Sequence, residues 1–302
     1  MPLPNLCLTE LELLVLDKCD SFVRLGVWPG SQLVNFRGWL ANFTEDDLER
    51  TYALHLLNAF TFYNSELCAA LAFGAVHSLS VTHASEAQMA DAILAWEDSL
   101  KRTVFVPVEG ERPNITDSGL MLAGMLRRRL GVSEDNFMPL DQLLQVLASG
   151  KHSFYRVVFF DDFIGSGQQF IKLLTTPRVN RFPSEVLSDA GCGVFYCCFV
   201  ATVYGMASVK RELPEVTVIP AHSIDQTHSV VDPNSRIWPN ELRSNVDDFI
   251  TNATQRAGLS AADRLGFHDL GLALAFEHTI PDASLPLLWH SSPTWTPLMR
   301  RA

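Results

Sequence analysis

The stretch from Tyr155 to Phe170, YRVVFFDDFIGSGQQF, decides how the chain is expected to fold. It opens with an apolar run rich in β-branched and aromatic residues, which is typical of a buried strand in a parallel sheet. Two acids, Asp161 and Asp162, close that run, and a small-residue turn, Gly165 to Gly167, comes after them. Apolar residues then recur at helical spacing, so the turn joins a strand end to a helix start.

A turn at this place in an open α/β sheet is a typical ligand site. Free backbone N–H groups and the positive end of the helix dipole suit a phosphate group. Neighbouring carboxylates suit sugar hydroxyls or a hydrated Mg²⁺ ion. The stretch therefore predicts a site for a ribose phosphate, although an acidic strand end followed by an ordinary glycine turn has the same residues.

The order of four apolar residues, two acids, two apolar residues and a small-residue turn resembles the signature loop of type I phosphoribosyltransferases. The resemblance implies that Asp161 and Asp162 are the catalytic acids, which contact the ribose hydroxyls of phosphoribosyl pyrophosphate. Through those hydroxyls or through water they would also meet Mg²⁺, the expected cofactor. The substrate-binding residues implied around the 5′-phosphate are Phe163, Ile164, Gly165, Ser166, Gly167, Gln168 and Gln169.

The turn departs from the Thr-Thr-Gly-Gly-Thr that is usual in that family, because it reads Gly-Ser-Gly-Gln-Gln here. Only Ser166 keeps a hydroxyl group. Phosphate contacts would therefore depend more on backbone N–H groups than on side chains.

A second loop, after the apolar run TVFVPV, resembles the pyrophosphate loop of the same family. The contacts that this implies are Gly110, Arg112, Ser118 and Gly119. Two glutamates in the loop would repel pyrophosphate unless a metal or Arg112 offsets their charge. A plain Gly/Pro surface loop explains the segment equally well.

The order of elements predicts an α/β fold with a parallel sheet of the type I phosphoribosyltransferase kind. Residues 1–100 have helical periodicity, with Thr44 starting a capping-box-like segment, and we expect them to form a helical N-terminal region. From Thr103 apolar strands alternate with amphipathic helices: the strands expected are TVFVPV, residues 156–160, VFYCCFV and VTVIPA, and the helices expected include residues 118–130 and 140–147. Residues 101–302 are therefore expected to form the α/β domain. The prolines near the C-terminus exclude a long helix there, which predicts an irregular hood.

The C-terminal segment also resembles a phosphoribosyltransferase-like family of bacterial conflict systems, in which a Thr-Pro-Asn-Asn-Thr-Leu-Pro-x-x-Trp stretch precedes a Trp-x-Pro-Leu segment. Trp39, Leu40 and Phe43, ahead of a long helix, are similar to that family too. The resemblance implies an effector of anti-phage defence, in some cases within a retron operon, restrained by a companion protein or ribonucleoprotein. The matching tail residues are Thr279, Pro281, Asp282, Leu285, Pro286, Trp289, Trp295, Pro297 and Leu298.

If the tail covers the sheet, Trp289 can stack on a base, and His278 or Glu277 can hydrogen-bond it or act as acid or base. The alternative is that these residues are packing and strand-face groups. For Trp295 we expect core packing.

Composition narrows the class of protein. A formal net charge of −11 over 302 residues argues against a general nucleic-acid surface. The uncharged stretch from residue 191 to 209 is nearly long enough to cross a membrane, but it divides into a strand and a helix start, so no membrane span is expected. Six cysteines without metal-ligand spacing, and no secretory segment, indicate a cytoplasmic protein with free thiols.

Three hypotheses for the function follow. The first is an enzyme that acts at the anomeric carbon of a phosphoribosyl or nucleotide substrate, either by transfer or, if water is admitted, by hydrolysis. The second is a non-catalytic nucleotide-binding sensor or assembly subunit, because this fold also serves regulators. The third is a structural subunit with an empty site. Binding and turnover separate the three hypotheses, and the sequence does not.

Overall fold

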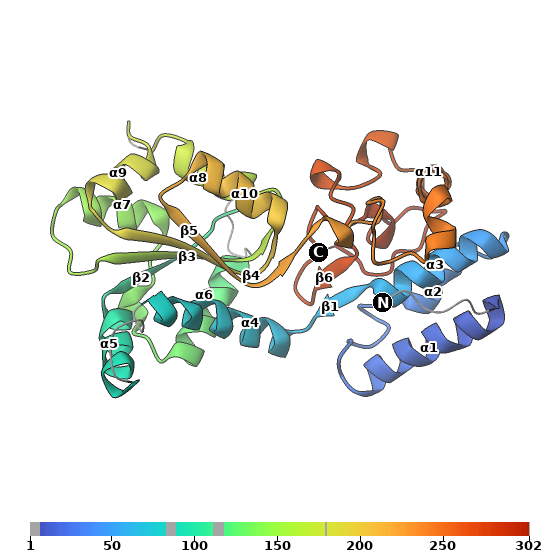
Figure 1. The fold of residues 1–302 in the computed structure, drawn as a ribbon, viewed down its shortest axis with the longest axis horizontal. Coiled ribbons are helices and arrows are strands. Elements are labelled where there is room, and N and C mark those ends of the chain that lie inside the picture. The colour runs from blue at the N-terminus through green and yellow to red at the C-terminus, as the bar shows by residue number, and fades with distance from the viewer. Residues whose placement is uncertain (1–6, 83–88, 111–117, 179, 302) are drawn as a thin grey trace. The chain divides into compact units, whose positions relative to one another are not determined.

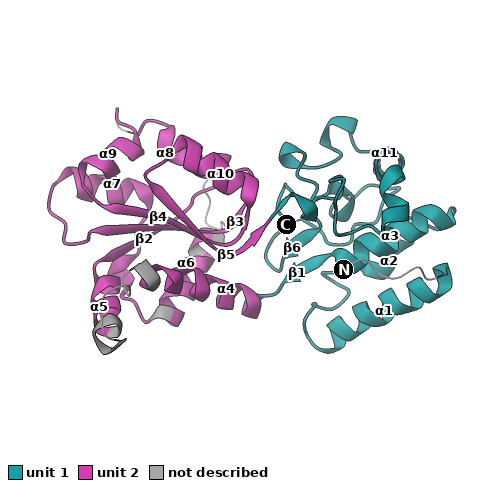
Figure 2. Cartoon of the chain, viewed as in Figure 1, with its two compact units in different colours: residues 1–65, 225–302 teal, residues 66–224 magenta. Residues whose placement is uncertain are grey.

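The computed structural model describes residues 7–82, 89–110, 118–178 and 180–301, and it divides the chain into two compact units. Unit 1 comprises residues 1–65 and 225–302, and unit 2 comprises residues 66–224 (Figure 2). This division differs from the expected one, in which the first hundred residues stand apart from the rest. The residue-100 boundary falls in a helix of unit 2, and the C-terminal segment shares a hydrophobic core with the N-terminal helices.

Unit 2 is built on a parallel four-stranded sheet in the order β2-β3-β4-β5. These strands confirm the four that the apolar runs predict, and they confirm the α/β fold class. Their bounds are β2 Thr103–Pro107, β3 Arg156–Ile164, β4 Gly193–Thr202 and β5 Val216–Ile224. Beyond β2, Phe137 makes an isolated parallel bridge to Phe105, which adds a short edge to the sheet.

Helices cover both faces of this sheet (Figure 1). One face carries α7 Leu140–Ala148, α8 Gln168–Thr175, α9 Pro183–Asp189 and α10 Val203–Glu212, whose apolar side chains form one cluster with alternate residues of the strands. The other face carries α6 Ser118–Leu130 and α4 Ser65–His77, which meet Phe160 and Cys197. Helix α5 Met89–Lys101 precedes β2. The uncharged stretch from 191 to 209 is thus β4 followed by the start of α10.

Unit 1 has little regular structure apart from its helices. These are α1 Leu8–Arg24, α2 Phe36–Leu40, α3 Asp47–Ala59 and α11 Val246–Ala257. Two three-residue strands, β1 Thr61–Tyr63 and β6 Leu274–Phe276, pair in parallel. Helix α3 is capped by Asp46, whose carboxylate accepts from the N–H groups of Leu48 and Glu49, and not by Thr44 as the sequence pattern suggests.

Aromatic residues from both ends of the chain fill the core of unit 1. Trp39 and Trp295 are buried, and the indole nitrogens of both donate to the carbonyl of Leu287, at 2.8 and 3.0 Å. The prediction that Trp295 is a core residue is therefore confirmed. Short 3-10 turns between residues 226 and 288 link the rest of the C-terminal segment, which is irregular as expected.

No helix in the described part of the chain is long and apolar enough to span a lipid bilayer.

Candidate functional site

The turn after β3 is held in one conformation by glycine. Gly167 has φ of +77° and forms the N-cap of α8, and a Cβ atom there would lie 2.8 Å from the carbonyl oxygen of Gly205. Because only glycine adopts positive φ at no steric cost, this residue sets the angle between the strand and the helix. We refer to residues 165–169 as the phosphate loop, after the role expected of them.

The start of α10 clamps the phosphate loop from the neighbouring strand end. The hydroxyl of Thr202 donates to the carbonyl of Gly165 and accepts from the N–H of Gly205 at 2.8 Å. Gly205 lies so close to the Gly165 carbonyl that a side chain there would collide with it. The loop is therefore preorganised by backbone contacts, and these contacts require glycine on both sides.

The first turn of α8 directs N–H groups into the loop. The first bond of the helix runs from the N–H of Ile171 to the carbonyl of Gly167, at 3.1 Å, so the three preceding N–H groups have no acceptor one turn back. That of Gln168 is 3.3 Å from the hydroxyl of Ser166, which is itself buried. Such a set of donors at the positive end of a helix suits an anionic group.

The two acids lie inside β3 rather than beyond its end, because pairing with β4 continues as far as Ile164. Asp161 is 7% exposed and accepts a 2.9 Å hydrogen bond from the hydroxyl of Tyr196. Burial, together with the neighbouring Asp162 carboxylate, raises the pKa of Asp161 well above its usual value, although the Tyr196 hydroxyl opposes this. The pKa of Tyr196 is also raised, mainly by burial, so its hydroxyl remains a donor.

This arrangement gives the two acids different surroundings. The Tyr196 ring stacks on Phe170 of α8, with 3.9 Å between ring centroids, so Asp161 is anchored in the core beneath the phosphate loop. A carboxyl group with a raised pKa holds a proton that an ordinary carboxyl would lose. Asp162, which is 8% exposed, lies next to it in the strand.

The loop after β2 meets the phosphate loop. The side-chain amide of Gln169 donates to the backbone carbonyl of Glu109 at 3.1 Å. Arg178 fixes the Glu109 carboxylate at 3.1 Å and also binds Asp141 at 2.7 Å. Between these groups is an open pocket of about 370 Å³, lined by Glu109, Gly110, Gln169, Lys172, Leu173, Thr176 and Arg178.

Of the other residues expected in the second loop, the structure describes Ser118 and Gly119. Ser118 and Gly119 begin α6, and a Cβ atom on Gly119 would lie 2.8 Å from the Cβ of Pro107, so the helix starts close against β2. Arg112 lies outside the described residues. The structure thus brings Gly110 and Gln169 together and places Ser118 and Gly119 at the end of the same strand.

The residues expected in the C-terminal hood belong to unit 1, whereas the loops belong to unit 2. Trp289 is half-buried, donates from its indole to the carbonyl of Ser284 at 3.2 Å, and has Arg301 5.2 Å from its ring centroid. His278 lies beside the ring of Phe276, with 5.6 Å between centroids. A role of Trp289 and His278 in binding a base stays a prediction.

Glu277, the other candidate acid or base in the tail, has a local partner. Its carboxylate accepts hydrogen bonds from the N–H and the hydroxyl of Ser65, each 2.6 Å long, at the start of α4. A carboxylate is favourable at a helix N-terminus.

Sequence reasoning missed Tyr196, Thr202 and Gly205. Thr202 is the last residue of β4 and Gly205 lies in the first turn of α10 after it, and the end of a strand that neighbours the phosphate-loop strand is where a contact to that loop is expected. That rule could have found them. No local pattern marks Tyr196 as the partner of an acid 35 residues away.

Within the described residues there is no group of three or more His, Cys, Asp or Glu side chains that could hold a metal ion.

A family model described as PRTase-CE matches residues 36–301 of the chain. Among solved structures, the orotate phosphoribosyltransferase from Aeropyrum pernix matches at 19% sequence identity and a TM-score of 0.26, over 42% of this chain and 63% of that one. No match was found among curated proteins.

Proposed function

The chain belongs to the PRTase-CE family, and from this premise we propose that it binds a phosphoribosyl or nucleotide substrate with Mg²⁺ and acts at the anomeric carbon. The observation that carries the proposal is the glycine-clamped phosphate loop directly after two acids of a central parallel strand. A ribose phosphate has an anion at one end and hydroxyls at the other, and this stretch offers donors for the first and carboxyl oxygens for the second.

In the proposed complex the 5′-phosphate accepts hydrogen bonds from the first N–H groups of α8, and Asp162 accepts from a ribose hydroxyl. A carboxylate held there stabilises the positive charge that develops on the ribose ring as the bond at the anomeric carbon breaks. Asp161, whose pKa is raised, would keep the neighbouring Asp162 in position through its own buried hydrogen bond to Tyr196. Its own part in binding would be that of a neutral carboxyl group.

The proposal includes Mg²⁺ as the partner of a pyrophosphate group. When bound, such an ion neutralises the charge of the leaving group. The carboxyl groups of Asp161 and Asp162 would meet it indirectly, through ligand hydroxyls or water. Gly110, beside the phosphate loop, is the backbone donor proposed for the pyrophosphate.

Transfer and hydrolysis differ only in the nucleophile that this site admits. A base bound against the anomeric carbon gives a nucleotide, whereas water gives free ribose phosphate. Trp289 and His278 stay predicted base contacts within unit 1, and we propose Arg112, Ser118 and Gly119 as contacts on the pyrophosphate side. The release of pyrophosphate with and without added bases separates transfer from hydrolysis.

One observation favours the second candidate, a nucleotide-binding sensor or assembly subunit without turnover. Asp161 is buried and already hydrogen-bonded to Tyr196, so one of the two acids is not free to hold a hydroxyl as an ionised group. Such a site can bind a nucleotide and respond to it without breaking a bond.

A role in anti-phage defence, with a companion protein or ribonucleoprotein that restrains the chain, is the further part of the proposal. Its support is the resemblance of the segment from Thr279 to Leu298, and of Trp39 to Phe43, to the family of bacterial conflict systems. Cells that express the wild-type chain or the Asp162→Asn variant are challenged with phage, which tests this role directly. Equal protection by the two would contradict an effector role of this site.

Calorimetric titration with phosphoribosyl pyrophosphate and Mg²⁺ tests the binding site. The wild type is compared with Asp162→Asn and with Glu212→Gln, a control that changes an exposed acid of α10 in the same unit. We expect Asp162→Asn to weaken binding by about tenfold or more, as the loss of a charge-assisted hydrogen bond does. Glu212→Gln should bind as the wild type does.

The outcomes separate the hypotheses. Binding with turnover supports the enzyme, and binding without any product supports the sensor. A wild type that binds neither phosphoribosyl pyrophosphate nor a nucleotide would contradict both.

A further inference from the structure

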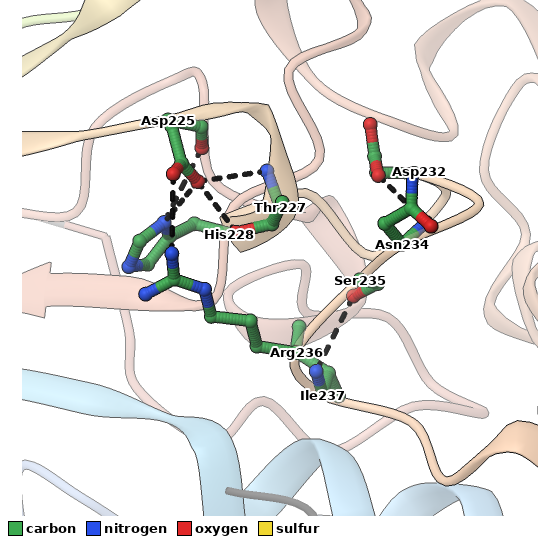
Figure 3. Close-up of polar contacts among 8 residues, drawn as sticks. All are labelled: Asp225, Thr227, His228, Asp232, Asn234, Ser235, Arg236 and Ile237. Atoms are coloured by element: carbon green, nitrogen blue, oxygen red, sulfur yellow. Dashed lines mark hydrogen bonds and ion pairs between the residues drawn. The ribbon is translucent and has the colours of Figure 1, made fainter.

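Asp225, the first residue of unit 1 after β5, organises a polar cluster that the proposed function does not use (Figure 3). Its Oδ1 accepts from the backbone N–H of Thr227 at 3.0 Å, from the Thr227 hydroxyl, and from Nδ1 of His228 at 3.1 Å. Its Oδ2 accepts from the guanidinium of Arg236 at 3.2 Å. A helix cap needs only the first of these bonds, so the remaining donors are additional to capping.

The partners of His228 determine which ring nitrogen carries the proton. Nδ1 lies 3.1 Å from the Asp225 carboxylate and 3.3 Å from the backbone carbonyl of the same residue, and both of these groups can only accept. Nδ1 must therefore be the donor, which leaves the lone pair of the neutral ring on Nε2. Within the described part of the chain, Nε2 makes no hydrogen bond, and the side chain is 35% exposed.

Arg236 is held beside this imidazole by its backbone. Its N–H donates to the carbonyl of Thr227 at 2.9 Å, and its neighbours Ser235 and Ile237 are buried. The Arg236 side chain is 62% exposed, and its guanidinium gives one of its five donors to Asp225. Hydrogen bonds from Thr227, first of all, lower the pKa of Asp225, so the carboxylate stays charged and keeps both partners in place.

The cluster therefore presents a fixed acceptor, Nε2 of His228, next to a fixed cation with unused donors, Arg236. A ligand that satisfies both needs an acidic O–H and an anionic oxygen on the same small group. Hydrogenphosphate has both, because its P–OH can donate to Nε2 while its other oxygens accept from the guanidinium. Sulfate is an anion of similar shape but has no proton to donate near neutral pH.

From this geometry we propose that Asp225, His228 and Arg236 form a hydrogenphosphate-binding site in unit 1. His228 and Arg236 contact the ligand, and Asp225 is a positioning residue that sets the tautomer of the imidazole. The site uses no residue of the phosphate loop, so a test of this site does not depend on the proposed function.

The test is an NMR titration of the full-length protein at about pH 8, above the ordinary range of histidine titration. Inorganic phosphate, methyl phosphate and sulfate are added in turn, and the ring nitrogens of His228 and the side-chain N–H of Arg236 are followed. We expect inorganic phosphate to shift these signals and to bind at least about tenfold more tightly than sulfate, the difference that one good hydrogen bond gives. Methyl phosphate distinguishes free phosphate from phosphate esters, because its dianion has no proton to donate to Nε2. Signal shifts as large as those with inorganic phosphate would mean that Arg236 alone holds a phosphate ester at this site. That result would overturn the role of Nε2.

Matched residues provide the controls. Nδ1 of His152 also donates to a backbone carbonyl, that of Phe154, at 3.0 Å, but no carboxylate of the described residues binds its ring, so its signals should not respond to phosphate. Arg236→Gln should weaken phosphate binding about tenfold, and Arg211→Gln, which removes another exposed arginine paired with an acid, should not.

Asp225→Asn should allow the other tautomer of His228, visible in the nitrogen chemical shifts without any ligand. A proton on Nε2 in the wild type, equal affinity for sulfate and phosphate, or unchanged phosphate binding by Arg236→Gln would each overturn the proposal.

Discussion

Asp161 is a carboxyl group whose surroundings favour the neutral form. It is buried, has a second carboxylate beside it, and accepts a hydrogen bond from Tyr196. Both burial and like charge penalise ionisation, whereas the tyrosine hydroxyl offsets only part of that penalty. At the scale of single residues this makes the site a source of pH-dependent stability as well as a candidate for ligand binding.

The pH dependence has a definite sign. The pKa of Asp161 is raised in the folded protein above the unfolded value of about 3.9, so the folded state binds the proton more tightly. The stabilising contribution of this group is complete below about pH 4 and is lost as the pH rises through the folded pKa. Asp161→Asn keeps a neutral acceptor for Tyr196, so its unfolding free energy should fall less than that of the wild type between about pH 4 and pH 7.

Urea unfolding at a series of pH values measures this difference. Asp189→Asn, an exposed acid of unit 2 paired with Arg181, is the control and should follow the wild type. A parallel course of Asp161→Asn and wild type would mean that Asp161 ionises normally.

His55 is the opposite case, a buried base. It is 4% exposed in α3, and its Nδ1 has no hydrogen-bond partner among the described residues. Burial lowers the pKa of His55, so the unfolded chain binds the proton more tightly. Stability is complete above the unfolded value of about 6.5 and is lost as the pH falls through it towards the folded pKa.

We expect His55→Leu to remove this loss, because leucine has no proton to take up and no polar atom to leave unpaired. The unfolding free energies of variant and wild type, compared at about pH 7.5 and about pH 5, should diverge on acidification in favour of the variant. His152→Leu, a less buried histidine, is the control. A difference in unfolding free energy between variant and wild type that stays constant with pH would contradict a buried neutral histidine.

At the scale of elements, the phosphate loop depends on two glycines that face each other across neighbouring strand ends. A methyl group on Gly205 would collide with the carbonyl of Gly165, which is backbone and cannot rotate away. Gly205→Ala should therefore push the loop from its position, at a cost of about 1–3 kcal/mol in unfolding free energy. It should also weaken binding of phosphoribosyl pyrophosphate more than that loss of stability explains.

Gly124→Ala is the matched control for this prediction. Gly124 lies inside α6, and a Cβ atom there would meet nothing within 4 Å. Alanine in a helix interior is more favourable than glycine by up to about 1 kcal/mol, so this variant should be more stable and bind normally. Calorimetry and thermal unfolding of both variants separate a steric effect from a general effect of alanine. Normal ligand binding by Gly205→Ala would show that the clamp does not hold the loop.

The sequence predicts helices and strands correctly where the signal for them is local. Helices α6 and α7 and the strands of unit 2 come from apolar runs and helical periodicity within short windows. The acids and the glycine turn were visible for the same reason. The bond from Tyr196 to Asp161 and the contact of Gly205 with Gly165 were not, because they join residues 35 and 40 positions apart that carry no paired pattern.

At the scale of the whole molecule the chain leaves unit 1, builds unit 2 and returns. Strand β1 pairs with β6 over only three residues, although the two are separated by more than half of the chain. Trp39 and Trp295, which come from the two ends of the chain, likewise donate to one acceptor, the carbonyl of Leu287. The boundary expected near residue 100 follows the change from helical periodicity to alternating strands and helices, whereas the core of unit 1 depends on contacts between the two ends, for which a single sequence gives no local signal.

This organisation predicts which fragments fold. Residues 66–224 contain all four strands of the larger sheet and the helices on both of its faces, so this fragment should unfold cooperatively in urea. Residues 101–302 lack α4 and separate residues 225–302 from Trp39 and the other N-terminal core residues, so this fragment should expose apolar surface and aggregate. Joining residues 1–65 directly to residues 225–302 should restore a folded unit 1, as judged by near-ultraviolet circular dichroism of its buried tryptophans. Cooperative unfolding of 101–302 together with aggregation of 66–224 would instead place the boundary near residue 100, where the sequence pattern changes.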